Sequence, residues 1–167
     1  MTPSNSDQKN DLLTLAAAPW VVIDDGVMGG RSAGQVSIDE GVSTFSGTLS
    51  LENNGGFSSI RLPLKQSLDG YSGIRLVVRG DGRRYQLRLR NGNRFDGVAW
   101  RTEFATQSEW TRVDFPFDQF TPGFRGRNVP QAGPVVAEEV RQIGILLGDK
   151  NPGPFHLEIR SIEGIAQ

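Results

Sequence analysis

The chain has 167 residues, of which 37% are hydrophobic and 22% are charged, and its formal net charge is −1. This length fits one domain with a self-sufficient core, and the composition is that of an ordinary globular protein. The sequence contains no cysteine and one histidine, which excludes disulfides and thiolate nucleophiles and leaves little for Ser/His catalysis. Its 21 glycines and 9 prolines favour strands and tight turns over helices.

Residues 1–18 precede the first predicted strand and contain one lysine, no arginine and two acids. This segment lacks the basic start of a secretory signal and the arginines of a mitochondrial presequence. We therefore expect a flexible or short helical tail in a cytoplasmic protein with no membrane span. Residues 19–167 are expected to form a single β-sandwich domain.

Short segments of alternating hydrophobic and polar residues recur along the chain, separated by Gly, Asn, Asp and Pro, and such segments predict β-strands. The predicted strands are Trp20–Asp24, Gln35–Asp39, Thr44–Glu52, Phe57–Leu62, Gly73–Arg79, Arg84–Arg90, Val98–Phe104, Thr111–Phe115, Gln142–Leu147 and Phe155–Ile162. Apart from the apolar run in the N-terminal tail, only Ala137–Arg141 looks briefly helical. Strands that do not alternate with helices indicate an all-β fold, either an antiparallel sandwich or a barrel.

The first candidate site is the glycine-rich segment 24–32, with the sequence DDGVMGGRS. Glycines at this density let backbone N–H groups converge on an anion or let the chain pass close to a partner. Nucleotide-binding glycine patterns are absent, and an irregular strand connection is the preferred explanation. Asp25, Met28 and Arg31 remain candidate binding residues. Two adjacent acids are too few for a calcium site, so we predict no metal and no cofactor.

The second candidate site is the segment 52–57, with the sequence ENNGGF. Glu52 and Asn53 could hold the hydroxyl groups of a sugar or the backbone of a partner. Asn54 and Gly55, in contrast, are the residues that a tight turn requires. This turn predicts a hairpin between the strands on either side of it.

Asp81 and Gly82 predict a second hairpin, because a two-residue turn of this type needs positive φ at both positions. One face of this hairpin is apolar and is predicted to be buried, and it consists of Ile74, Leu76, Val78, Tyr85, Leu87 and Leu89. The opposite face is rich in arginine.

The third candidate site is this arginine stripe. Its members are Arg75, Arg79, Arg84, Arg88 and Arg90, with Arg61 and Arg101 expected nearby. Residues 61–101 carry ten basic and three acidic residues. The predicted hairpin sets Arg75 opposite Arg88 and Arg79 opposite Arg84, which is unfavourable unless anions neutralise the charges. Those anions are either internal acids, such as Glu103 or Glu158, or groups of an acidic partner, and the sequence favours neither.

Two further residue types bear on function. His156 alternates with Phe155 and Leu157, which places it on the polar face of its strand. Trp110 has polar neighbours by alternation and is the tryptophan expected to be exposed, as a sugar-binding surface would require, whereas Trp20 is expected in the core.

Five stretches carry a family resemblance: DDGVMGGRSAG at 24–34, FSGTLSLENNGGFSSIRLP at 45–63, GIRLVVRGDGRRYQLRLR at 73–90, FRGR at 124–127 and IGILLGDKNPGPFHLEI at 143–159. In these stretches the chain resembles the complex I intermediate-associated protein 30 family. The resemblance implies a galactose-binding-like jelly-roll fold, in agreement with the predicted strands. It also implies a role similar to that of the eukaryotic members, which resemble assembly chaperones for mitochondrial respiratory complex I.

We therefore expect a non-catalytic protein-binding module that resembles an assembly factor and binds a partner with an acidic surface. The alternative is a module that binds a carbohydrate or a small ligand, such as an anion, through the rim loops. An enzyme ranks third, and nucleic acid is not an expected partner.

Overall fold

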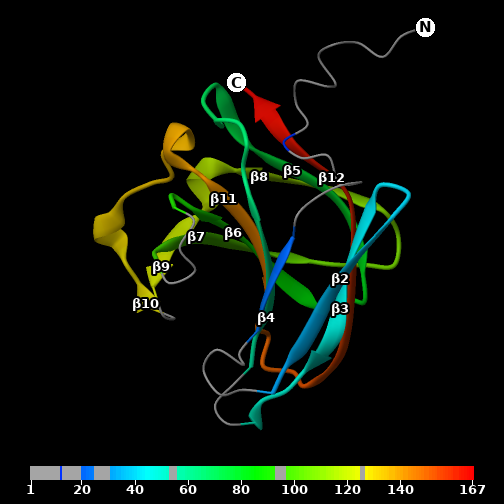
Figure 1. The fold of residues 1–167 in the computed structure, drawn as a ribbon. Coiled ribbons are helices and arrows are strands. Elements are labelled where there is room, and N and C mark those ends of the chain that lie inside the picture. Colours follow the sequence, from blue (N-terminus) through cyan, green and yellow to red (C-terminus); the bar gives the residue numbers. More distant parts are fainter. Residues whose placement is uncertain (1–11, 13–19, 25–30, 53–55, 93–96, 125–126) are drawn as a thin grey trace, which may run out of the picture.

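The computed structural model describes residues 12, 20–24, 31–52, 56–92, 97–124 and 127–167 (Figure 1). The strands are β1 (Val21–Asp24), β2 (Ala33–Asp39), β3 (Val42–Leu49), β4 (Ser58–Pro63), β5 (Tyr71–Gly80), β6 (Arg84–Arg90), β7 (Ala99–Ala105), β8 (Thr111–Pro116), β9 (Thr121–Phe124), β10 (Arg127–Asn128), β11 (Gln142–Leu147) and β12 (Gly153–Ala166). Among the described residues, short 3-10 helices lie between strands at η4 (Phe117–Gln119), η5 (Pro130–Ala132) and η6 (Ala137–Glu139).

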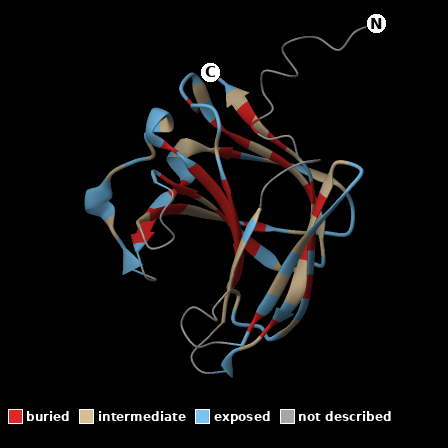
Figure 2. Cartoon of the chain, viewed as in Figure 1, coloured by how far each residue is buried: buried red, intermediate tan, exposed pale blue. Residues whose placement is uncertain are grey.

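The strands form two antiparallel sheets that pack face to face (Figure 1). One sheet has seven strands in the order β1-β4-β11-β6-β7-β9-β10, and the other has five in the order β2-β3-β12-β5-β8. Hydrophobic side chains from both sheets meet in one core between them (Figure 2). The predicted all-β antiparallel sandwich is therefore confirmed.

The alternation of apolar residues identifies the inner faces of β5 and β6 correctly. The six side chains predicted to be buried together, from Ile74 to Leu89, are at most 1% exposed and belong to the core. Trp20 packs against this core and donates its indole N–H to Ser43 Oγ. Strand β9 was missed because Pro122 and Gly123 do not resemble strand residues.

Both predicted hairpins are wrong. Strand β5 pairs with β12 and β8, whereas β6 pairs with β11 and β7, so the Asp81–Gly82 turn connects the two sheets. Strands β3 and β4 also lie in different sheets, and the Asn54–Gly55 turn between them falls outside the described residues. The inward alternation is the same whether two strands pair with each other or face each other across a core, so it could not distinguish the two cases.

A two-residue turn, Glu40–Gly41, closes the hairpin between β2 and β3. Both residues have positive φ, 50° and 80°, as this turn type requires. Gly82 has a φ of 89°, but Asp81 is not among the described non-glycine residues with positive φ. The Asp81 carboxylate instead accepts the backbone N–H groups of Arg83 and His156 and the hydroxyl of Tyr85. These hydrogen bonds attach the turn that connects the two sheets to β12.

Leu12 is the described part of the predicted N-terminal tail. Its side chain is buried, and its N–H donates to the carbonyl of Ile162 at 3.1 Å. At this residue the segment is therefore hydrogen-bonded to β12.

Candidate functional site

Arg75 and Arg79 lie on the outer face of the five-stranded sheet, and each is paired with an acid on the neighbouring strand. Arg75 binds Asp114 of β8 through two hydrogen bonds of 2.7 and 3.2 Å. Arg79 binds Glu158 of β12 in the same way. These hydrogen bonds lower the pKa of Asp114 and of Glu158 below their ordinary values. For these two arginines the neutralising anion is internal.

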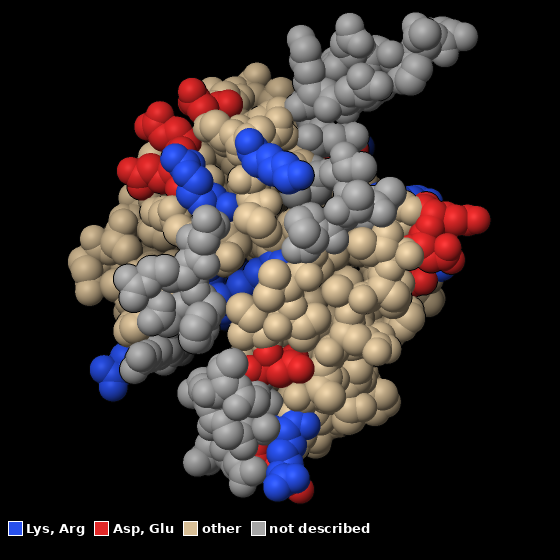
Figure 3. Space-filling model, viewed as in Figure 1, with Lys and Arg blue, Asp and Glu red and all other residues tan. Residues whose placement is uncertain are grey.

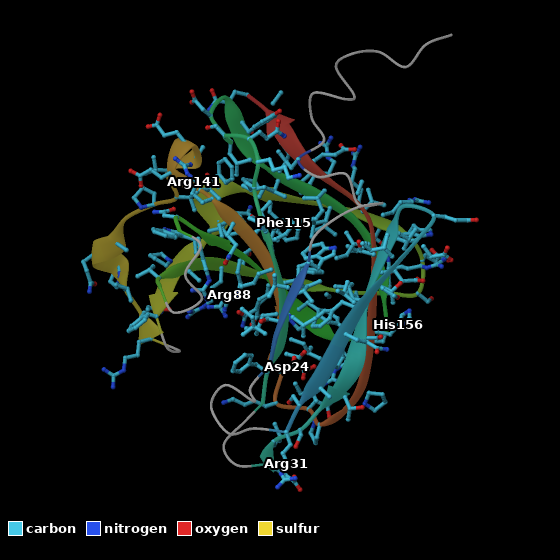
Figure 4. All side chains as sticks on the ribbon, viewed as in Figure 1. Asp24, Arg31, Arg88, Phe115, Arg141 and His156 are labelled. Atoms are coloured by element: carbon cyan, nitrogen blue, oxygen red, sulfur yellow. The ribbon has the colours of Figure 1, made fainter. Side chains whose placement is uncertain are left out.

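Trp110 is not an open aromatic platform, contrary to the expectation. The guanidinium groups of Arg79 and Arg160 lie 4.5 and 4.4 Å from the centre of its ring, which are cation–π contacts. His156 lies on the polar outer face of β12, as predicted, and its side chain is exposed, with Nε2 3.8 Å from Glu158 Oε1 (Figure 4).

Arg84, Arg88 and Arg90 belong to the seven-stranded sheet, so the predicted stripe is divided between opposite sides of the sandwich. Arg75 does not oppose Arg88, and Arg79 does not oppose Arg84. Arg84 lies 3.4 Å from Glu103, and both side chains are largely exposed.

Arg88 and Arg90 meet Arg61 on the outer face of the seven-stranded sheet. In the strand register, Gly144 of β11 pairs with Arg61 on one side and with Arg88 on the other, and Arg88 pairs in turn with Arg101. Two residues along the strands, on the same outer face, Gln142 of β11 pairs with Arg90 of β6. We call Arg61, Arg88, Arg90 and Gln142 the arginine site. In Figure 4, Arg88 lies on the side of β11 away from β12.

The arginine site is recessed although it lies on an outer face. Arg61, Arg90 and Gln142 are each only 7% exposed. Together with Ser59, Gly144 and Leu146 they line a small pocket. Gly144 leaves the floor of this pocket without a side chain, and an added Cβ would lie 3.4 Å from Arg61 Cγ. Figure 3 shows Lys and Arg atoms set back between other atoms near the centre of this view.

The arginine site concentrates positive charge in a partly dry environment. Burial, followed by the charges of Arg90 and Arg88, lowers the pKa of Arg61 to about 9. Burial, followed by the charges of Arg90 and Arg101, lowers the pKa of Arg88 to about 10. Both guanidinium groups remain charged at neutral pH, because these values lie well above 7.

The hydrogen-bonding capacity of the arginine site is incompletely used. Arg90 donates to the carbonyl of Gly97 at 2.9 Å, and Arg88 makes a marginal contact of 3.5 Å with Gln86. Arg88 Nε and Gln142 Oε1 are buried and have no hydrogen-bond partner among the described residues. Buried polar atoms rarely lack a hydrogen-bond partner. The site can therefore bind a ligand that supplies an acceptor for Arg88 Nε and a donor for Gln142 Oε1.

The two loop candidates lie only partly within the described residues, since Asp25, Met28 and Asn53 fall outside them. Arg31 and Glu52 are described and form an ion pair of 3.4 Å, with side chains 69% and 70% exposed. The described ends of the two segments, Arg31 and Glu52, therefore lie side by side.

Sequence reasoning suggested Arg61 as a neighbour of the stripe but gave no sign of Gln142 or Gly144. Both lie on β11, more than fifty residues after β6, and only the sheet order brings them beside Arg88. Within the described ranges, no group of three His, Asp or Glu side chains could hold a metal ion. No helix in the described part of the chain has the length and apolar character needed to cross a membrane.

Comparison with known families gives one match. The sequence profile of complex I intermediate-associated protein 30 matches residues 7–159. The Mus musculus protein named complex I intermediate-associated protein 30, mitochondrial, is 29% identical over 165 residues, which cover 84% of this chain and 50% of that protein. A Caenorhabditis elegans protein, named probable complex I intermediate-associated protein 30, mitochondrial, is 28% identical over 146 residues, which cover 74% of this chain and 43% of that protein.

The chain thus spans about half the length of the curated relatives it matches. These relatives, and a third from Caenorhabditis briggsae, are all named mitochondrial, which contradicts the cytoplasmic location expected from the sequence. That expectation depended on the composition of a short N-terminal segment, which is weak evidence for a compartment.

Solved structures with the same architecture include carbohydrate-binding modules of Clostridium thermocellum. The family 11 module, in complex with a β-1,3-1,4-mixed-linked tetrasaccharide, has a TM-score of 0.72 and 14% identity and covers 94% of this chain and 95% of that chain. A family 30 module has a TM-score of 0.62 and 11% identity, and the match covers 94% of this chain and 96% of that chain. At these identities the likeness shows the fold alone, a galactose-binding-like jelly-roll sandwich.

Proposed function

Because the chain belongs to the complex I intermediate-associated protein 30 family, we propose that it is a non-catalytic protein-binding module that acts as an assembly factor for respiratory complex I or another multi-subunit complex. Family membership over residues 7–159 is the observation that carries this proposal. The relatives are named for an association with complex I intermediates, and an assembly factor acts by binding such intermediates.

The chemistry of the described residues supports binding over catalysis. The single histidine is exposed, and its Nε2 lies 3.8 Å from Glu158 Oε1. Glu158 is itself held by Arg79, which keeps the pKa of that carboxyl low and makes it a poor base. The pocket of the arginine site contains cations and an amide but, among the residues that line it, no nucleophile activated by a base.

The test is deletion of the gene in its host, followed by native electrophoresis of the respiratory complexes. We expect assembled complex I to fall and partly assembled forms to accumulate, and the wild-type gene to restore the complex. An unchanged level of complex I, and of other multi-subunit complexes in the same gel, would refute the proposal.

A carbohydrate-binding module is the second candidate. Its fold is that of known carbohydrate-binding modules, and two of the candidate residues, Arg31 and Glu52, form an ion pair. Against it, Trp110 is covered by Arg79 and Arg160, and stacking on an open aromatic ring is the usual basis of sugar affinity. Calorimetric titration with a mixed-linked β-glucan tetrasaccharide distinguishes the candidates, because only the second predicts binding.

A further inference from the structure

The arginine site places three guanidinium groups within adjacent rows of one sheet face. Neighbouring strands are about 4.8 Å apart, so Arg61 and Arg88, with one strand between them, are separated by about 10 Å at the backbone. Arg90 lies two residues after Arg88 on the same outer face, beside Gln142. The nearest register partner of Arg88 on the other side is another arginine, Arg101. Like charges in such positions repel, and an anion between them removes the repulsion.

The unpartnered atoms indicate which kind of anion fits. Arg88 Nε needs an acceptor, and Gln142 Oε1 needs a donor. A peptide segment that carries carboxylates supplies both, because its side chains accept from guanidinium groups and its backbone N–H groups donate to an amide oxygen. A fully ionised inorganic anion supplies acceptors alone. A glucan would meet charged groups with no aromatic ring among the residues that line the pocket.

The pocket is small and recessed. Gly144 keeps the floor open between Arg61 and Arg88. The surrounding residues are recessed, so a side chain that projects from a partner reaches the guanidinium groups more easily than a flat surface does. Carboxylates bind guanidinium groups through paired hydrogen bonds, which favours arginine over lysine at such a position.

We propose that Arg61, Arg88, Arg90 and Gln142 form a binding site for the carboxylate groups of an acidic segment of a partner protein. This proposal rests on the proposed function, because it assumes that the partner is a protein. The surface that we expect to bind an acidic partner is thus no longer the whole arginine stripe. It is limited to the arginine site on β4, β6 and β11. Arg75, Arg79 and Arg84 are excluded from that surface by their pairing with Asp114, Glu158 and Glu103.

The test uses a capped hexaglutamate peptide as the probe and calorimetry at low ionic strength as the measurement. We expect the wild-type chain to bind it and R88Q to bind it about tenfold more weakly or worse, which corresponds to the loss of one strong charge-assisted contact. The matched control is R84Q, on the same strand and the same face, where an exposed pair is lost and affinity should change by less than about twofold. Added salt should weaken wild-type binding.

A second variant keeps the proposal testable if R88Q fails to fold. Q142L keeps all the charges but removes the amide oxygen, and it should weaken hexaglutamate binding while leaving the melting temperature close to that of the parent. Inorganic phosphate serves as the competing probe. No binding of hexaglutamate, equal weakening by R88Q and R84Q, or Arg88-dependent binding of phosphate without binding of the peptide would each overturn the proposal.

Failure of the site can be told apart from failure of the proposed function. If the wild-type gene and R88Q restore complex I equally in the deletion host, and hexaglutamate does not bind, the site is refuted while the function stands. If deletion leaves the complexes unchanged but hexaglutamate binds through Arg88, the assembly role is refuted while the carboxylate site stands.

Discussion

The outer faces of the two sheets both carry arginines, but their neighbours differ. On the five-stranded sheet, the register sets Arg75 opposite Asp114 and Arg79 opposite Glu158. On the seven-stranded sheet it sets Arg88 between Gly144 and Arg101. Arginines opposite acids stabilise the sheet that holds them. Arginines opposite glycine or another arginine concentrate charge that the local register does not neutralise, and such a place is suited to an external anion.

The largest expected effect tests whether β6 holds Arg88 firmly. Leu87 is adjacent to Arg88, points inward and is fully buried. Leu87→Ala should lower the free energy of unfolding by about 2–5 kcal/mol, because it leaves a cavity in the core. Urea denaturation measures this loss. A cost well under 1 kcal/mol would mean that β6 is loosely packed and that Arg88 has no fixed position.

A second test concerns Arg83, the most completely bonded arginine of the described chain. Its guanidinium binds both oxygens of Asp149 and the carbonyls of Asn151, Gly153 and Pro154, and its side chain is 10% exposed. Arg83→Met should cost about 2 kcal/mol, because it leaves the partly buried Asp149 carboxylate without its cation. The control is Arg84→Met, whose exposed side chain should contribute less than about 0.5 kcal/mol. Equal losses of stability in the two variants would show that the hydrogen bonds of Arg83 do not make it more important for folding than Arg84.

The paired acids also predict a dependence on pH. Hydrogen bonds from arginine lower the pKa of Asp149, Asp114 and Glu158. A carboxyl group with a lowered pKa in the folded state stabilises the protein above its unfolded pKa, and this contribution is lost as the pH falls through the folded value. Unfolding measured from pH 6 downward should show stability falling below about pH 4, and Arg83→Met should fall less because Asp149 has already lost its partner. An identical decline in both proteins would contradict this assignment.

A smaller effect is expected on the outer face of the five-stranded sheet. Arg75→Glu sets a carboxylate opposite Asp114 and should cost about 1 kcal/mol, since the pair is partly exposed and screened by solvent. Thermal denaturation at low and high salt measures it, and the loss should shrink with added salt. A stabilised variant would show that Arg75 is not held by Asp114.

The smallest effect is expected in the arginine site itself. Arg88→Met removes a partly buried charge beside Arg61 and Arg90 and should leave stability unchanged or raise it by up to about 1 kcal/mol. Calorimetric melting of the variant beside Arg84→Met provides the measurement. A loss above 2 kcal/mol would show that Arg88 is a structural residue, and the contrast between the two sheet faces would disappear.

Much of the fold was predictable because inward alternation is a local property. The six buried residues from Ile74 to Leu89 follow from the spacing of apolar side chains alone. The partners of each strand were not predictable, because β5 and β6 face each other across the core instead of pairing. The two-residue turn at Glu40–Gly41 was missed because its sequence is not one of the favoured Asn-Gly or Asp-Gly pairs.

The candidate site was predictable only in part, for the same reason. The concentration of arginine in residues 61–101 is visible in the sequence, but which arginines have acids beside them depends on strand order. Glu158 is nearly eighty residues from Arg79 along the chain, and Gln142 is more than fifty from Arg90. Separations of this kind leave no local pattern.

Strands β11 and β12 are interior strands, with β11 between β4 and β6 and β12 between β3 and β5. During synthesis, neither sheet can close until residues 142–166 have left the ribosome. Up to that moment β3, β4, β5 and β6 expose edges that other nascent chains can pair with. The protein should therefore fold late and slowly, after its last strands emerge, and its yield in a cell should depend on how long those edges are shielded.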